Sequence, residues 1–125
     1  MVSITPSSPI EVLRQQRHAR WLEDLVGKLR GLVASQPLSA DQQLHILLFG
    51  SRARGDWDGY SDTDLLVVAP QQEEADLWAD RLLDAGLAED VVPLDQRRWQ
   101  GMATSASPHW RAVKAQAISL LSLPQ

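Results

Sequence analysis

Two aspartates separated by one residue, Asp62 and Asp64, have the clearest chemical potential in this sequence. They lead into the apolar run 65–69, which indicates a strand, and side chains two residues apart on a strand share one face, roughly 6 to 7 Å apart. Magnesium binds one or two protein carboxylates together with triphosphate oxygens, and can act in pairs about 3.5 to 4 Å apart. Asp62 and Asp64 therefore indicate metal-assisted chemistry on a phosphate ester, with two Mg²⁺ ions expected.

A phosphate-binding turn is predicted at Gly50-Ser51, directly after the apolar run 44–49. Glycine lets the backbone approach a bulky anion, and Ser51 supplies a hydroxyl and a backbone N–H. If Ser51 opens a short helix over 52–54, its free N–H groups also favour phosphate. No lysine stands in a GxxxxGK[ST] pattern, so a P-loop ATPase is excluded.

Charged residues near this turn have two interpretations. Arg52 and Arg54 could neutralise the charge of a bound nucleotide, whereas Arg54 could equally pair with Asp56 or Asp58 and shape the loop. Asp56, Asp58 and Gly59 are predicted to form a turn, and a role of Asp58 as a metal ligand is the alternative.

Aromatic residues and histidines are less specific signals. Trp57 and Tyr60 stand in the loop beside the carboxylates, where stacking on a base, contact with a partner and packing within the loop all remain open. His45, inside a predicted strand, is interpreted as an ordinary buried or edge histidine. No cluster of histidines suggests a metal site.

The remaining sequence alternates between helical and extended patterns, which indicates an α/β class. Ser8-Pro9 has the cap and proline of a helix start, and Gly86 fits the end of a helix. We expect one domain, 1–125, with an N-terminal helix over about 8–35, a motif core over about 44–94 and a C-terminal helical segment over about 95–122. Within these regions the patterns predict strands over 44–49, 65–69 and 88–94, helices over 71–85, 95–99 and 107–117, and a short last strand over 118–121.

Composition limits the class of protein. The chain has 125 residues, 44% of them hydrophobic, which suits one modest core. It has no cysteine, so thiolate zinc sites and disulfides are excluded. A formal net charge of −4 argues against nonspecific nucleic-acid binding. Neither a membrane span nor a secretion signal is apparent, so we expect a cytoplasmic protein.

The combined pattern resembles a known family. Gly50-Ser51, ten residues, then Asp62-Thr63-Asp64 matches the GSx10DxD motif of the DNA polymerase β-like nucleotidyltransferase superfamily. The segments GSRARGD and SDTDLLVV are similar to those of its minimal nucleotidyltransferase branch. This branch includes the MntA-type antitoxins of HEPN/MNT toxin–antitoxin systems. The resemblance is strongest over 47–68.

This resemblance implies a mixed β-sheet flanked by helices, with a third carboxylate on a strand beside the DxD strand. Asp90 matches that position because it enters the third predicted strand; Asp95, at the far end of that strand, is the alternative and could instead cap the next helix. By resemblance, Asp62, Asp64 and Asp90 would be catalytic and bind magnesium. Gly50, Ser51 and Arg52 would bind the nucleotide.

The implied activity is transfer of a nucleoside monophosphate, AMP from ATP, to a hydroxyl. The short chain leaves little room for acceptor-binding structure, so we expect the acceptor to be a partner protein. Together with the resemblance, this favours an antitoxin that AMPylates a tyrosine of a HEPN-type ribonuclease toxin in a hetero-oligomer. Transfer to a small molecule such as an aminoglycoside, and a non-catalytic antitoxin that acts by occlusion, are the alternatives.

Overall fold

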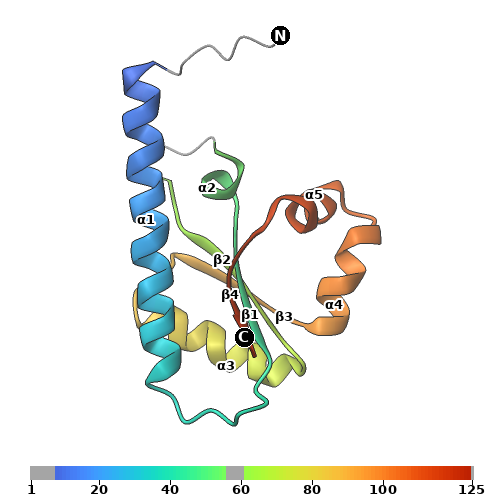
Figure 1. Cartoon of the computed structure of the whole chain (residues 1–125). Helices are drawn as coiled ribbons and strands as arrows, with labels where there is room; N and C mark the ends of the chain where they lie inside the picture. Colours follow the sequence, from blue (N-terminus) through green and yellow to red (C-terminus); the bar gives the residue numbers. More distant parts are fainter. Residues whose placement is uncertain (1–7, 56–60, 125) are drawn as a thin grey trace. The chain divides into compact units, whose positions relative to one another are not determined.

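The computed structural model describes residues 8–55 and 61–124, and it divides into two compact units, residues 1–35 and 36–125. The first unit is the helix α1, Pro9–Ala34 (Figure 1). The predicted start is confirmed, because Ser8 caps the helix by accepting a hydrogen bond from the Glu11 N–H to its Oγ at 3.2 Å. On its surface, Asp24 and Lys28 form an i,i+4 ion pair at 2.9 Å.

The second unit is built on a four-stranded mixed sheet with the strand order β3-β2-β1-β4. Strand β1 (Leu44–Phe49) pairs antiparallel with both β2 (Asp64–Ala69) and β4 (Ile118–Leu123). Strand β3 (Asp90–Asp95) pairs parallel with β2, and helix α3 (Gln72–Asp84) makes the crossover that a parallel pair requires. The predicted α/β class with a mixed sheet is therefore confirmed.

Helices cover the sheet because its strands are apolar on both faces. Leu66 and Val68 belong to a buried cluster with Leu47 and Phe49, completed by Met102 and Val113. The helices of this side are α4 (Gln96–Gly101), the 3₁₀ turn η1 (Met102–Thr104) and α5 (Pro108–Gln116). By strand alternation Leu65 and Val67 face the opposite way, and α3 packs on β2 and β3. The side of α4 and α5 is separate from that of α3 in Figure 1.

Capping residues and a helix-ending glycine correctly predict most ends of the helices. Gly86 follows α3 with a positive φ of 71°, the left-handed conformation expected of a helix-ending glycine. Asp95 and Ser107 cap α4 and α5, accepting hydrogen bonds from the N–H groups of Arg98 and Trp110. The last strand is longer than expected and extends to Leu123. No helix within the described ranges has the length and apolarity to cross a membrane.

Candidate active site

The turn after β1 is fixed by a glycine. Gly50 has φ 80° and ψ −159°, a region that only glycine adopts readily, and it caps the short helix α2 (Ser51–Arg54). Its carbonyl oxygen accepts hydrogen bonds from Ala53 and Arg54, both at 3.1 Å. The short helix predicted after Ser51 is thus confirmed, and its binding of phosphate stays a prediction.

Gly50 is also in close contact with the second aspartate of the DxD motif. A Cβ built on Gly50 would overlap Oδ2 of Asp64 and lie 3.3 Å from its Cγ. The carboxylate therefore lies against the backbone of the turn, in space that any other residue would fill. The two halves of the motif, ten residues apart in sequence, meet at this contact because Phe49 and Asp64 are register partners on β1 and β2.

The sheet brings Asp90 beside Asp64. The two are register partners on the parallel strands β2 and β3, so their side chains project from the same face of neighbouring strands, about 5 Å apart across the sheet. Asp95 pairs with Ala69 at the other end of β3, where its Oδ1 accepts a hydrogen bond from the Arg98 N–H at 2.7 Å. The predicted capping role of Asp95 is confirmed, and the register favours Asp90 as the third carboxylate.

Negative charge accumulates around Asp64. Burial raises the pKa of Asp64 above its ordinary value, and the neighbouring charges of Asp90, Asp62 and Glu89 raise it further, while Arg54 acts in the opposite direction. A cation at this position would favour the ionised carboxylate. The electrostatics therefore fit a site that binds a positively charged ligand.

Asp64 and Asp90 offer the hard oxygen donors that magnesium prefers. Two protein carboxylates suit a magnesium ion whose other ligands are triphosphate oxygens. Among residues 8–55 and 61–124, no three Asp, Glu or His side chains are close enough together to hold a metal ion. Asp62 precedes β2 and is exposed. That all three aspartates share metal therefore stays a prediction.

The arginines of α2 have partners inside the protein. The guanidinium of Arg52 donates two hydrogen bonds to the carbonyl oxygen of Ser61, from Nε at 3.2 Å and from Nη2 at 2.9 Å. Arg54 acts electrostatically on Asp64. Asp56, Trp57, Asp58 and Tyr60 lie outside the described residues, so the predictions made for them stay as they were.

Sequence reasoning missed Glu89. Its carboxylate Oε2 accepts a hydrogen bond of 2.6 Å from the backbone N–H of Thr63, the buried residue between the two aspartates. In return, the carbonyl oxygen of Thr63 accepts hydrogen bonds from the N–H groups of Glu89 at 3.1 Å and Asp90 at 3.3 Å. The adjacent acidic residues at 89 and 90 were the available signal, but nothing local indicates which would contact the DxD segment.

A small cavity lies against β3, on the face of that strand that also carries Asp90. It has a volume of about 270 Å³ and is lined by Val92 and Leu94, which follow Asp90 on the same face of β3, and by Arg98, Met102, Ser105 and Trp110. β3 is an edge strand of the sheet. None of the lining residues within 8–55 and 61–124 is acidic.

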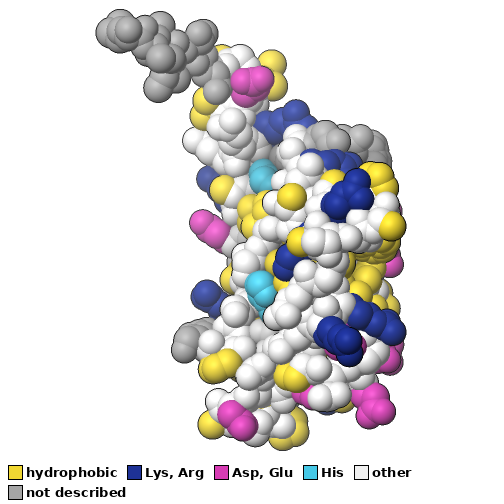
Figure 2. Space-filling view, turned by 90° about the vertical axis from the view of Figure 1, so that its right-hand side faces the viewer, with side chains coloured by type: hydrophobic (Ala, Val, Ile, Leu, Met, Phe, Trp, Pro, Cys, Tyr) yellow, Lys and Arg dark blue, Asp and Glu magenta, His cyan; other side chains and the backbone are white. Residues whose placement is uncertain are grey.

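Basic and hydrophobic side chains are both visible on the side of α4 and α5 in Figure 2. In this part of the chain Arg97, Arg98 and Arg111 are exposed. The surface near the cavity therefore carries positive charge on these two helices.

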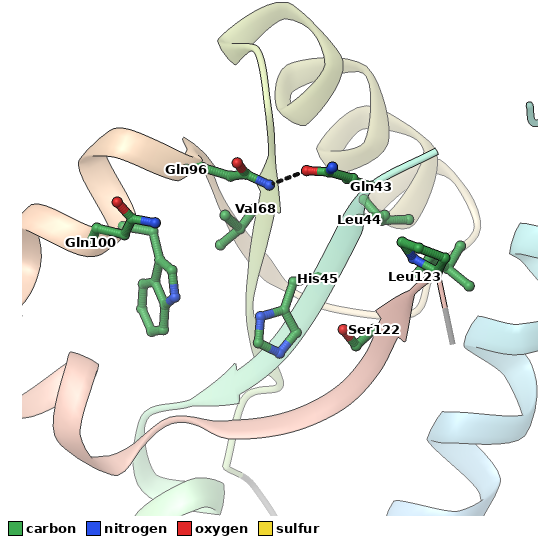
Figure 3. Close-up of a pocket in the computed structure, with 10 residues that line it drawn as sticks. Gln43, Leu44, His45, Val68, Gln96, Gln100, Ser122 and Leu123 are labelled. Carbon is green, nitrogen blue, oxygen red and sulfur yellow. Dashed lines mark hydrogen bonds between the residues drawn. The ribbon is translucent and has the colours of Figure 1, made fainter. Parts of the chain in front are cut away.

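A second cavity, of about 400 Å³, lies at the opposite end of β1 and β2 from the carboxylates (Figure 3). Gln43 and Gln96 are joined across it by a hydrogen bond of 2.7 Å. His45 lines it and contacts the Ser119 hydroxyl through Nε2 at 2.8 Å. His45 is half-buried, so its interpretation as an ordinary edge or buried residue fits this setting.

Comparison with known proteins gives one family. A family model described as "Nucleotidyltransferase domain" matches residues 35–102, more than half of the chain. The matched range includes Gly50, Ser51, Asp62, Asp64 and Asp90. Searches of curated proteins and of solved structures gave no significant match.

Proposed function

This chain belongs to the nucleotidyltransferase domain family, and on that premise we propose that it transfers AMP from ATP to a hydroxyl group of a partner protein. The register of Asp64 with Asp90, with Gly50 against Asp64, is the observation that carries the proposal. It brings the Gly50-Ser51 turn and two carboxylates together at one end of the sheet. This arrangement suits attack on a phosphorus atom of a bound triphosphate.

The proposed step is an in-line displacement. The acceptor oxygen forms a bond to the α-phosphorus of ATP, the bond from that phosphorus to the bridging α,β-oxygen breaks, and pyrophosphate leaves with the electron pair. Asp90 accepts the proton of the acceptor hydroxyl. Gly50 and Ser51 hold the triphosphate, so the protein contributes mainly orientation and charge neutralisation.

Asp62 and Asp64, with Asp90, would hold magnesium beside the triphosphate. When bound, the metal neutralises the charge that develops on the attacking and leaving oxygens. The raised pKa of Asp64 supports this assignment, because closely spaced carboxylates need a cation to remain ionised together.

We assign the acceptor to a HEPN-type ribonuclease toxin, which makes this chain an antitoxin. The sequence of the motif, GSRARGD and SDTDLLVV, supports membership of the minimal nucleotidyltransferase branch of the family. The cavity against β3 supports a neutral acceptor over a polycationic one. Its walls are largely apolar, made by Val92, Leu94, Met102 and Trp110, and Arg98 would repel an aminoglycoside. A tyrosine side chain has an apolar ring and a terminal hydroxyl that fit such walls.

The test uses α-labelled nucleoside triphosphates, magnesium and a HEPN-type protein encoded beside this chain. We expect label from ATP on the partner with the wild type, loss with Asp62→Asn and Asp64→Asn, and loss after chelation of the metal. Label transfer that survives both substitutions would contradict the catalytic assignment. If wild type and variants inhibit the partner equally, occlusion is the mechanism. Label on an aminoglycoside, with none on the protein, would support the small-molecule alternative.

A further inference from the structure

We propose that Arg52 and Glu89 are positioning residues that together fix the backbone of Asp62. This inference rests on the proposed function for its consequence in catalysis, and on the hydrogen bonds alone for its structural part. Asp62 precedes the first residue of β2, so the hydrogen-bond ladder of the sheet does not hold it, and its side chain is exposed.

The two contacts act on the two peptide groups that flank Asp62. Arg52 donates two hydrogen bonds, from Nε and Nη2, to the carbonyl oxygen of Ser61, which belongs to the peptide group before Asp62. Glu89 accepts the hydrogen bond from the N–H of Thr63, which belongs to the peptide group after Asp62. Fixing both peptide planes sets φ and ψ of the residue between them, because these are the only soft backbone dihedrals.

We call these two contacts, from Arg52 to Ser61 and from Thr63 to Glu89, the clamp. It connects elements that meet only in the folded chain. Arg52 stands on α2, directly after the Gly50 turn, and Glu89 stands immediately before β3. The bond from Thr63 to Glu89 involves a charged acceptor at 2.6 Å, the shorter and stronger class of hydrogen bond. The Gly50-Ser51 turn and Asp90 are thereby held in a fixed position relative to Asp62.

Glu89 is assigned a positioning role and not a metal-binding one because its Oε2 is already engaged by a backbone donor. This distinction can be tested by chemistry. Glutamine keeps an oxygen acceptor of the same reach but has no charge, whereas alanine has neither. A positioning role predicts that Glu89→Gln behaves like the wild type, and a charge-based role predicts that it behaves like Glu89→Ala.

The first experiment measures hydrogen exchange of the Thr63 backbone amide by NMR, in protein free of metal and nucleotide. We expect exchange about 10-fold faster in Glu89→Ala and within about 3-fold of wild type in Glu89→Gln, because a lost hydrogen bond exposes the amide to local opening. Glu73→Ala, an exposed glutamate on α3, is the control. Unchanged exchange in a folded Glu89→Ala protein would overturn the clamp.

The second experiment measures AMP transfer to the partner with the same variants and with Arg52→Ala. We expect kcat to fall about 10- to 100-fold in both alanine variants, with KM for ATP changed less than about 3-fold, because misplacement by about 1 Å can cost 10²-fold in rate. Arg97→Ala, which removes an exposed arginine of α4, is the matched control. Equal loss in Glu89→Gln and Glu89→Ala would overturn the positioning role.

Binding of α,β-methylene-ATP with magnesium separates the two proposals. If wild-type protein neither binds this analogue nor transfers label, the proposed function fails, while Thr63 exchange still decides whether the clamp exists. If wild type is active and all clamp variants keep full kcat, the catalytic part of this inference is wrong and the proposed function stands.

Discussion

Asp64 and Asp90 are register partners on two parallel neighbouring strands, although 25 residues and a helix separate them along the chain. Parallel pairing places equivalent ends of strands at one edge of the sheet, so the start of β3 comes beside the start of β2. Burial is the main cause of the raised pKa of Asp64, and the charge of Asp90 is the largest of the electrostatic causes.

Asp90 and Asp95 can be separated by substitution. Asp90→Asn is expected to reduce AMP transfer at least about 100-fold, the usual scale for a lost general base. Asp95→Ala removes the α4 cap and should lower the free energy of unfolding by about 1 kcal/mol while transfer stays within about 3-fold. Label transfer and urea unfolding measure the two effects. The opposite pattern would make Asp95 the functional carboxylate.

Gly50→Ala should damage both stability and activity. The new Cβ would overlap the Asp64 carboxylate and force a backbone conformation that costs about 1 to 3 kcal/mol. Gly55→Ala is the control, because Gly55 also has a positive φ, 86°, but none of the residues that the structure describes lies within 4 Å of its added Cβ. We expect Gly55→Ala to lose stability and keep transfer, and Gly50→Ala to lose both. Normal transfer in a folded Gly50→Ala protein would mean that displacement of Asp64 does not matter.

Trp110→Leu tests the cavity against β3. We expect KM for the partner protein to rise about 10-fold while binding of the ATP analogue is unchanged, since aromatic side chains often dominate protein recognition. Trp99→Leu is the matched control: Trp99 packs against the same hydrophobic cluster but lines the other cavity. Equal effects of the two substitutions on acceptor KM would argue for a general packing defect.

His45 predicts a pH dependence of stability. Burial, and secondarily the charge of Lys114, lower the pKa of His45 below the ordinary value of 6.5. The unfolded chain therefore binds a proton more readily than the folded one, so stability is fully present above about pH 6.5 and decreases as the pH falls through the lowered pKa. Urea unfolding of wild type and His45→Gln between pH 5 and 7.5 measures this effect. We expect a weaker pH dependence in the variant; identical slopes would exclude His45 as the cause.

The sequence by itself determined the local chemistry and most of the element ends. Proline and capping residues start α1 and α5, Gly86 ends α3, and short apolar runs mark the strands, because these signals act through backbone sterics and nearest hydrogen bonds. The spacing of Gly50-Ser51 from Asp62 and Asp64 was sufficient to indicate the family, since the motif is contiguous enough to be recognised without the fold.

Only the tertiary structure decided which distant residues meet. The register of β2 with β3 placed Asp90, and not Asp95, beside Asp64, and the same pairing brought Glu89 to the backbone of Thr63. Sequence could not show this contact, because a carboxylate that accepts a backbone N–H has no spacing rule when its partner is 26 residues away. Local patterns fix what a residue can do, whereas the sheet register, a long-range packing outcome, fixes what it touches.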